Sequence, residues 1–213
     1  MDIQNLSYEQ KCQLLQSVCE KLNKNNVATY VVDKKQDVIE KFCQIAPKGS
    51  VVGVAGSVSV AQCGLLDYVK SGEYNFVERN VDKDTDYLLC SSNAVTCDGV
   101  LYNVDGNANR IAQISNGPKN VVMVVGINKI VANLDEAILR VKTHCAPLNA
   151  RRLGIETYCA VKGRCKSLDV CENPQMTDGC TSGTRICCSY LVCGQQRVKD
   201  RIKIIFVMEE LGF

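Results

Sequence analysis

Apolar residues recur at helical spacing near the start of the chain, in residues 7–25. Leu15, Val18 and Leu22 fall on one face of such a helix. Ser7 and Gln10 form a capping-box pair ahead of them, which predicts that the helix begins there. The same kind of spacing predicts further helices at 37–44, about 60–69 and 134–141.

Short apolar runs between the helices predict strands. The run VVMVVG at 121–126 has no polar alternation, as expected of a strand that is covered on both faces. Similar patterns occur at 28–32, 51–56, 86–89, 100–104 and 203–208. Because strands alternate with helices, we expect an α/β fold, with a mostly parallel sheet flanked by helices.

The chain of 213 residues is interpreted as a single domain. An N-terminal part of helices and a strand occupies 1–50, and a cysteine-rich segment at 146–195 returns to a last strand at 203–208. In sheets of this kind, ligands bind outside the carboxyl ends of the strands. The loops that follow the strands are therefore the place to look for a site.

Charge and hydropathy exclude several classes of partner. The formal net charge is +2, with acidic and basic residues interspersed, so nothing indicates a nucleic-acid partner. The apolar runs are strand-length and fall short of the roughly 18 residues that span a bilayer, so we expect no membrane partner. The first residues lack the basic and apolar regions of a signal peptide, and we expect a cytoplasmic location.

The chain contains 14 cysteines, in two groups. Seven are scattered over the first 150 residues and are expected to act as small buried hydrophobic residues. The other seven crowd into 159–193 without a C-x2-C pair, so neither a zinc ribbon nor a ferredoxin motif is matched. Four of these thiolates could converge on a metal ion or an iron–sulfur cluster, or all seven could be free thiols in an irregular segment.

Polar residues gather in the segment 90–110, CSSNAVTCDGVLYNVDGNANR. Its Asp-Gly pairs predict two turns on either side of the strand at 100–104. We expect part of this segment to bind a small polar ligand, with Arg110 suited to a carboxylate or phosphate. The alternative is a hairpin whose polar residues cap their own turns, with Arg110 on a helix surface and Asn103 as a strand residue.

Two further loops follow predicted strands. The segment at 56–59, Gly-Ser-Val-Ser, precedes a helix and could offer N–H groups and hydroxyls to an anion, or could simply cap the helix. It lacks the lysine of a P-loop and the third glycine of a dinucleotide fingerprint, so no nucleotide cofactor motif is present. Asn128 and Lys129 follow the strand at 121–126, and Lys129 could hold an anion, act as a nucleophile if desolvated, or be solvated.

Five ordered blocks of sequence resemble the lactate-utilisation (LUD) domain family: 56–67, 85–110, 116–131, 135–153 and 197–213. The resemblance implies a fold similar to sugar-phosphate isomerases and CoA transferases. It also implies a part in oxidation of L-lactate, beside iron–sulfur partner subunits. In this chain Ala108 replaces a glycine that is common in the family.

The motifs and the resemblance together give a set of candidate residues. The expected ligand-binding residues are Gly56, Ser57, Ser59, Ser92, Asn93, Asp105, Asn109, Arg110, Asn128 and Lys129. The resemblance maps a metal set onto Cys159, Cys165, Cys180 and Cys187, for an iron–sulfur cluster or zinc.

The leading hypothesis is a subunit or accessory protein in oxidation of L-lactate or a related small organic acid, binding the anion at strand-end loops. One alternative is a metal- or cluster-binding protein without its own reaction. The other is an isomerase- or transferase-like enzyme acting on a phosphorylated or CoA-linked substrate, which rests on fold analogy alone.

Overall fold

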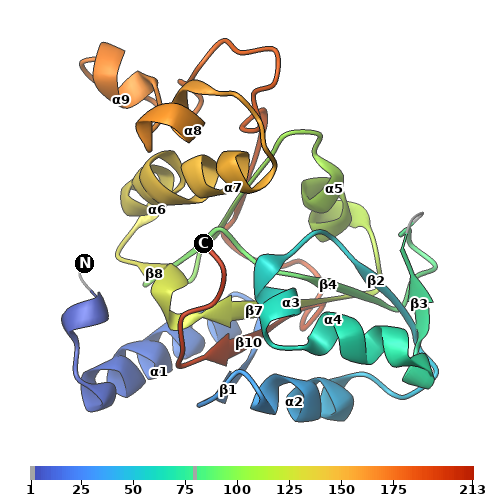
Figure 1. Ribbon diagram of the computed structural model, residues 1–213. Helices are drawn as coiled ribbons and strands as arrows, with labels where there is room; N and C mark the ends of the chain where they lie inside the picture. The colour runs from blue at the N-terminus through green and yellow to red at the C-terminus, as the bar shows by residue number, and fades with distance from the viewer. Residues whose placement is uncertain (1–2, 79–80) are drawn as a thin grey trace.

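The computed structural model describes residues 3–78 and 81–213, and a six-stranded sheet forms its centre (Figure 1). The strands are β1 (Ala28–Val32), β2 (Val51–Val54), β3 (Asn75–Val77), β4 (Tyr87–Cys90), β7 (Asn120–Gly126) and β10 (Ile202–Val207). They are ordered β1-β10-β7-β4-β2-β3, and every neighbouring pair is parallel. The predicted parallel sheet flanked by helices is confirmed.

The continuous apolar character of β7 follows from its central place in this sheet. Val121, Met123 and Val125 contribute to the core on one face of the sheet. Val122 and Val124 contribute to the core on the other face. Because successive side chains point to opposite faces, a strand covered on both sides has no position left for a polar residue.

Helices cover both faces of the large sheet. α1 (Tyr8–Lys24) packs on one face and is capped by Ser7 and Gln10, as predicted. α2 (Asp37–Ile45), α3 (Val58–Gln62) and α4 (Leu65–Tyr68), followed by the π-helical turn η2 (Val69–Glu73), lie on the other face. The helix predicted at about 60–69 is interrupted, because Gly64 takes a left-handed conformation with φ 74° between α3 and α4.

A second sheet of four strands lies beside the first and was not predicted. Its strands are β5 (Ala94–Thr96), β6 (Leu101–Asp105), β8 (Ile130–Val131) and β9 (Ser189–Cys193), in the order β8-β5-β6-β9. β5 and β6 are antiparallel and joined through the Asp98-Gly99 turn, so that turn is confirmed as part of a hairpin. The strand predicted at 100–104 thus belongs to this sheet and not to the parallel one.

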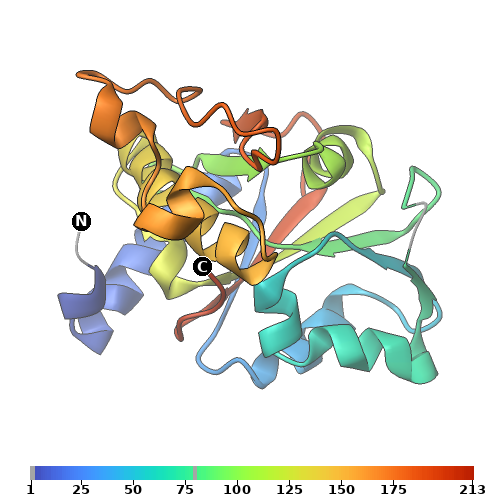
Figure 2. The ribbon, with the colours of Figure 1, turned by 45° about the horizontal axis from the view of Figure 1, so that its top comes forward.

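The helices α6 (Leu134–Arg140), α7 (Ala146–Arg152), α8 (Tyr158–Lys162) and α9 (Ser167–Val170), with the turn η4 (Val141–Cys145), gather on the far side of the second sheet from α1 and α2 (Figures 1 and 2). α5 (Asn109–Asn116) and the turn η3 (Ile127–Lys129) instead contribute Ile114 and Ile127 to the core that α1 packs against. A third core joins Tyr102 of β6 to Ala137 of α6 and Ala150 of α7. In the part of the chain that the structure describes, no helix has the length and apolar character to cross a membrane.

Candidate functional site

A cavity of about 650 Å³ opens where the carboxyl ends of β2, β4 and β7 meet the second sheet. These three strands are neighbours in the large sheet, so the loops after them converge. Nine of the ten predicted ligand-binding residues line this cavity: Gly56, Ser57, Ser59, Ser92, Asn93, Asp105, Asn109, Arg110 and Lys129. Asn128 does not line it.

Lys129 is the most deeply buried cation of the cavity, with 3% of its surface exposed. It ends the η3 turn after β7. Its Nζ donates to Ser59 Oγ at 2.9 Å and to Ser91 Oγ at 3.0 Å. Lys129 forms no ion pair with any Asp or Glu among residues 3–78 and 81–213.

Burial without a carboxylate partner changes the protonation of this lysine. Loss of hydration, reinforced by the neighbouring Arg140 and Arg110 guanidinium groups, lowers the pKa of Lys129 from 10.5 to about 7. The nearby thiols of Cys145 and Cys90 oppose that change. A positive charge on Lys129 therefore lacks a protein counter-ion, and an anionic ligand would supply one.

Arg110 has a structural role in the protein, in place of the anion-binding role that the sequence suggests. Its guanidinium donates to the side chains of Asp105, Asn103 and Asn93, and to the carbonyls of Ser91 and Val104. These acceptors engage all five of its N–H groups. Arg110 thus links both sheets to α5 and contributes its charge to the cavity, while no N–H is left for a ligand.

Two of the predicted residues line the cavity, but their polar atoms are hydrogen-bonded within the protein. Ser92 Oγ donates to the carbonyls of Ala94 and Tyr102. The Asp105 carboxylate accepts from Arg110 and from the backbone N–H of Ile111. The polar atoms of these two side chains are therefore already engaged.

Asn93 and Asn109 retain groups that a ligand can use. Asn93 Oδ1 accepts from the Val104 N–H and from Arg110, whereas its amide nitrogen donates to no acceptor in the described chain. Asn109 is exposed at the start of α5, and its side chain makes no hydrogen bond within the described residues. Ala108, just before it, has φ 57°, a left-handed conformation that glycine adopts without strain.

The loop at 56–59 caps a helix, as one of its two expected roles requires, and it also lines the cavity. Ser57 Oγ accepts from the Val60 N–H and caps α3, so the helix-cap interpretation is confirmed. Ser59 is 1% exposed and accepts from Lys129. Gly56 is exposed, and its position on the cavity wall leaves open space where a side chain would stand.

Asn128 is a structural residue here, in contrast to the prediction. Its Oδ1 accepts from the Leu211 N–H at 3.1 Å, and this bond fixes the segment after β10. The end of that segment lies at the site, because Phe213 lines the cavity. Gly212, just before it, has a left-handed conformation with φ 59°. A Cβ atom on Gly212 would lie 2.7 Å from Ser59 Oγ and 3.2 Å from Lys129 Nζ.

The sequence patterns missed one wall of the cavity, which α7 and the preceding turn η4 provide. Val141, Cys145, Asn149 and Arg152 all line it. Their spacing of four, four and three residues places them on one helical face, and this signal could have identified them. Ser91, which directly follows β4, was also missed, although the strand-end rule applies to it equally.

The four predicted metal cysteines lie together at a second, small cavity of about 30 Å³. Cys159, Cys165, Cys180 and Cys187 all line it, and Cys187 also lines the large cavity. Burial raises the pKa of the Cys159 thiol, and raises that of Cys187 to about 12. Within the ranges that the structure describes, no group of three or more His, Cys, Asp or Glu side chains is arranged to hold a metal ion.

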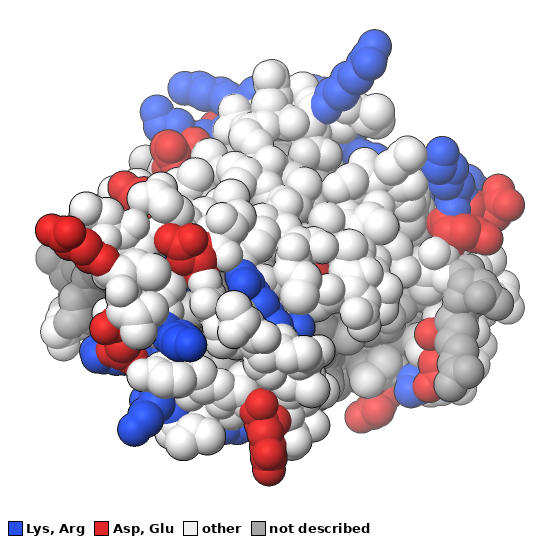
Figure 3. Space-filling model, turned by 90° about the horizontal axis from the view of Figure 1, so that it is seen from above, with Lys and Arg blue, Asp and Glu red and all other residues white. Residues whose placement is uncertain are grey.

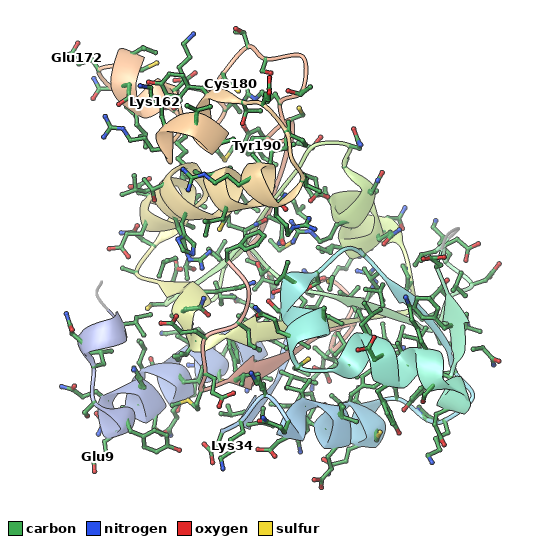
Figure 4. The ribbon with its side chains drawn as sticks, in the orientation of Figure 1. Glu9, Lys34, Lys162, Glu172, Cys180 and Tyr190 are labelled. Carbon is green, nitrogen blue, oxygen red and sulfur yellow. The ribbon has the colours of Figure 1, made fainter. Side chains whose placement is uncertain are left out.

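Figure 4 places Cys180 and Tyr190, which both line this small cavity, in the upper part of the molecule above α7. Glu172 lies farther out, near α9. Figure 3 shows the molecule from above. Few charged side chains lie at the centre of this view, and most of the Lys, Arg, Asp and Glu side chains lie toward its edge.

Fold and cavity together define an α/β domain with a ligand-sized, positively charged cavity at its strand ends. The chain belongs to the LUD domain family, whose profile matches residues 15–207. No curated protein matches the chain.

Two solved structures are similar to this chain. One is a DUF162 family protein from Deinococcus radiodurans, with 15% identity over 95% of this chain and 99% of that chain, and a TM-score of 0.49. Another is ribose 5-phosphate isomerase from Plasmodium falciparum, with 14% identity over 46% of this chain and 53% of that chain, and a TM-score of 0.34. At these scores neither similarity carries a conclusion about activity.

Proposed function

We propose that this LUD-domain protein binds a small organic-acid anion in the large cavity and acts as a subunit or accessory protein in oxidation of L-lactate or a related acid. The observation that carries the proposal is Lys129, a buried cation on the cavity wall with no acidic partner in the described chain. A bound carboxylate would pair with it and remove the cost of its isolation.

The charge balance of the cavity supports an anionic ligand. Lys129, Arg110 and Arg152 line it, against the two carboxylates of Asp105 and Glu78. Asp105 is already paired with Arg110 at 3.0 Å, and Glu78 is exposed. Lys129 is thus the cation at the buried end that has no carboxylate partner among the described residues, so an anion is favoured there.

The volume of the cavity bears on which acid it takes. About 650 Å³ lies within the range of cavities that bind drug-sized ligands, so a three-carbon acid would fill only a small part. The remaining space suits a larger related acid, including a phosphorylated one, or residues of a partner subunit. In this proposal the electrons of lactate oxidation would leave through a metal centre in this chain or on an iron–sulfur partner subunit.

Isothermal titration of the full chain tests the proposal. L-lactate, pyruvate and phosphorylated three-carbon acids are titrated into the wild type and into Lys129→Met, with Lys162→Met as an exposed control on α8. We expect binding to the wild type and the control, and a loss of about tenfold or more in Lys129→Met, since a buried ion pair is removed. The proposal fails if none of these acids binds, or if Lys129→Met binds them like the wild type.

A second candidate function is metal or cluster binding, favoured by the convergence of the four predicted cysteines on one small cavity. Because the pKa values of Cys159 and Cys187 are raised, these thiols hold their protons near neutral pH, and a metal would have to displace them. Some rearrangement of the four cysteines would also be needed, since no ready-made ligand set is present among the described residues.

Anaerobic purification with iron and zinc analysis tests this second candidate. We expect about one metal ion or cluster per chain, lost in Cys159→Ser and retained in Cys12→Ser, where the thiol is exposed. A colourless, metal-free wild type would reject it. The isomerase- or transferase-like alternative has no comparable observation in its favour.

A further inference from the structure

Two lysines are deeply buried among the residues that the structure describes, Lys129 and Lys142, and their hydrogen bonds differ. Lys142 donates to Ser167 Oγ at 2.8 Å and to the carbonyls of Gln175 at 2.6 Å and Asp178 at 2.8 Å. Three acceptors match the three N–H groups of an ammonium. Lys129 has only the hydroxyls of Ser59 and Ser91, so one position on its nitrogen has no partner in the described chain.

The unmatched position of Lys129 lies at the large cavity, because Lys129 lines that cavity and Lys142 does not. Gly212 keeps the approach open. A Cβ atom at this residue would lie within 3.2 Å of Nζ, so any other side chain would crowd the amine. The nitrogen is thus buried from bulk solvent, held by two hydroxyls and open toward a cavity that can take a small molecule.

The surroundings of Lys129 favour its neutral form. The charged or titratable groups near it come from several elements: Arg110 of α5, Arg140 of α6, Cys90 of β4, and His144 and Cys145 of η4. The two guanidinium groups oppose a third positive charge, and burial removes hydration. The pKa of about 7 leaves a substantial fraction of neutral amine at neutral pH, and a neutral, desolvated lysine amine is a nucleophile toward carbonyl carbon.

We propose that Lys129 forms a covalent imine with the carbonyl carbon of a small 2-oxo acid bound in the large cavity. The inference rests on the proposed function, because the same cavity must first bind the acid. It narrows the ligand class to acids that carry a carbonyl group beside the carboxylate, such as the oxidised partner of a 2-hydroxy acid.

The chemistry balances without an added oxidant or reductant. The amine nitrogen attacks the carbonyl carbon, a C–N bond forms, and the carbonyl electron pair moves to oxygen, which takes up one of the two protons of the amine. The resulting carbinolamine loses this oxygen as water with the second nitrogen proton, and the nitrogen electron pair completes the C=N bond of the imine. Ser59 and Ser91 hold the nitrogen at 2.9 and 3.0 Å, so their hydroxyls are placed to donate to and accept from the departing oxygen.

The ammonium form of Lys129 still has a role alongside imine formation. The free cavity holds Lys129 as a mixture of ammonium and amine near pH 7, and a 2-hydroxy acid can pair with the ammonium. A 2-oxo acid reacts with the amine, and the carboxylate then faces the remaining positive groups of the cavity. The same residue therefore distinguishes the reduced acid from the oxidised acid by forming a bond with only one of them.

Reductive trapping tests the inference on the full chain. The protein is incubated with pyruvate and borohydride, and intact mass and peptide mapping locate the product. We expect one reduced pyruvate unit on Lys129, no adduct in Lys129→Met, and an unchanged adduct in the exposed-lysine control Lys162→Met. L-lactate, which carries a hydroxyl in place of the 2-oxo group, should give none.

A second variant guards against loss of folding. Gly212→Ala retains Lys129 but places a methyl group near its Nζ. The rate of adduct formation should fall by about tenfold or more, because the methyl group displaces the 2-oxo acid from the position in which its carbonyl carbon meets Nζ. Titration with L-lactate runs in parallel. Lactate binding without a pyruvate adduct on Lys129, or adducts spread over exposed lysines, overturns the imine and leaves the proposed function intact, whereas absence of binding by either acid removes the proposed function itself.

Discussion

The buried charge of Lys129 should make the free energy of unfolding depend on pH in a particular direction. In the unfolded chain this lysine holds its proton up to a pKa of 10.5, whereas in the folded chain it releases the proton above about 7. Between these values the unfolded state binds more protons, so stability rises with pH. Below about pH 7 both states are protonated, and the folded state bears the full cost of the buried charge.

The size of the effect follows from the same two values. Each pH unit above the folded pKa of about 7 adds about 1.4 kcal/mol. From about pH 6 to about pH 9, Lys129 should therefore add roughly 3 kcal/mol to the free energy of unfolding. Lys129→Met removes this contribution, while Ser59 and Ser91 each lose the hydrogen bond that their hydroxyl accepts from Nζ, at roughly 1 kcal/mol each.

Urea denaturation of the wild type and of Lys129→Met, at several pH values in buffers without carboxylate or phosphate, measures the difference. We expect Lys129→Met to be the more stable protein near pH 6 and to lose that advantage near pH 9. Lys142→Met serves as the comparison. It should be destabilised, since it leaves three acceptors without a donor. A difference between wild type and Lys129→Met that stays constant within about 0.5 kcal/mol across this range would refute the reasoning.

Other outcomes follow from the same site. Affinity for an organic-acid anion should fall as pH rises above about 7, because the ammonium of Lys129 is lost, and titration calorimetry in buffers of different ionisation enthalpy should detect proton uptake on binding. Arg110→Lys should lower the free energy of unfolding by roughly 3–5 kcal/mol in urea melts, because Asp105 and several carbonyls lose their partners. Ala108→Gly should stabilise the chain by roughly 1 kcal/mol in the same assay, since φ is 57°. Maleimide should label the exposed Cys12 well before Cys187, because a pKa of about 12 leaves almost no thiolate at Cys187. Mass spectrometry measures the order of labelling.

Elements with strong local signals were predictable from the sequence. The capping box at Ser7 and Gln10 and the buried run at 121–126 each act within a few residues, and both predictions are confirmed. The second sheet depends on distant pairing. β6 pairs with β9, which is far away in the sequence, through partners such as Asn103 and Leu191. β8 has only two residues, so no local pattern predicts that sheet.

The candidate site was predictable where it follows from strand order. Ser59 and Lys129 come after strands that prove to be close in the sheet, which explains why the strand-end rule placed both of them at one cavity. Which polar groups remain free was not predictable, because it depends on side-chain partners. Arg110 and Asn128 have the right chemistry for a ligand, yet every N–H of the Arg110 guanidinium is engaged by the protein, and Asn128 lies outside the cavity with its Oδ1 bonded to the Leu211 N–H.

The hydrogen bonds of Arg110 have a consequence for mutational scans of this family member. One guanidinium joins the loop after β4, the end of β6 and the start of α5, so the cavity takes its shape only once these three parts are assembled. Substitutions of Arg110 should therefore reduce the amount of protein in the cell as well as its activity. A scan that scores growth alone would not separate Arg110, which builds the cavity, from Lys129, which we propose meets the ligand; protein abundance measured in parallel would separate them.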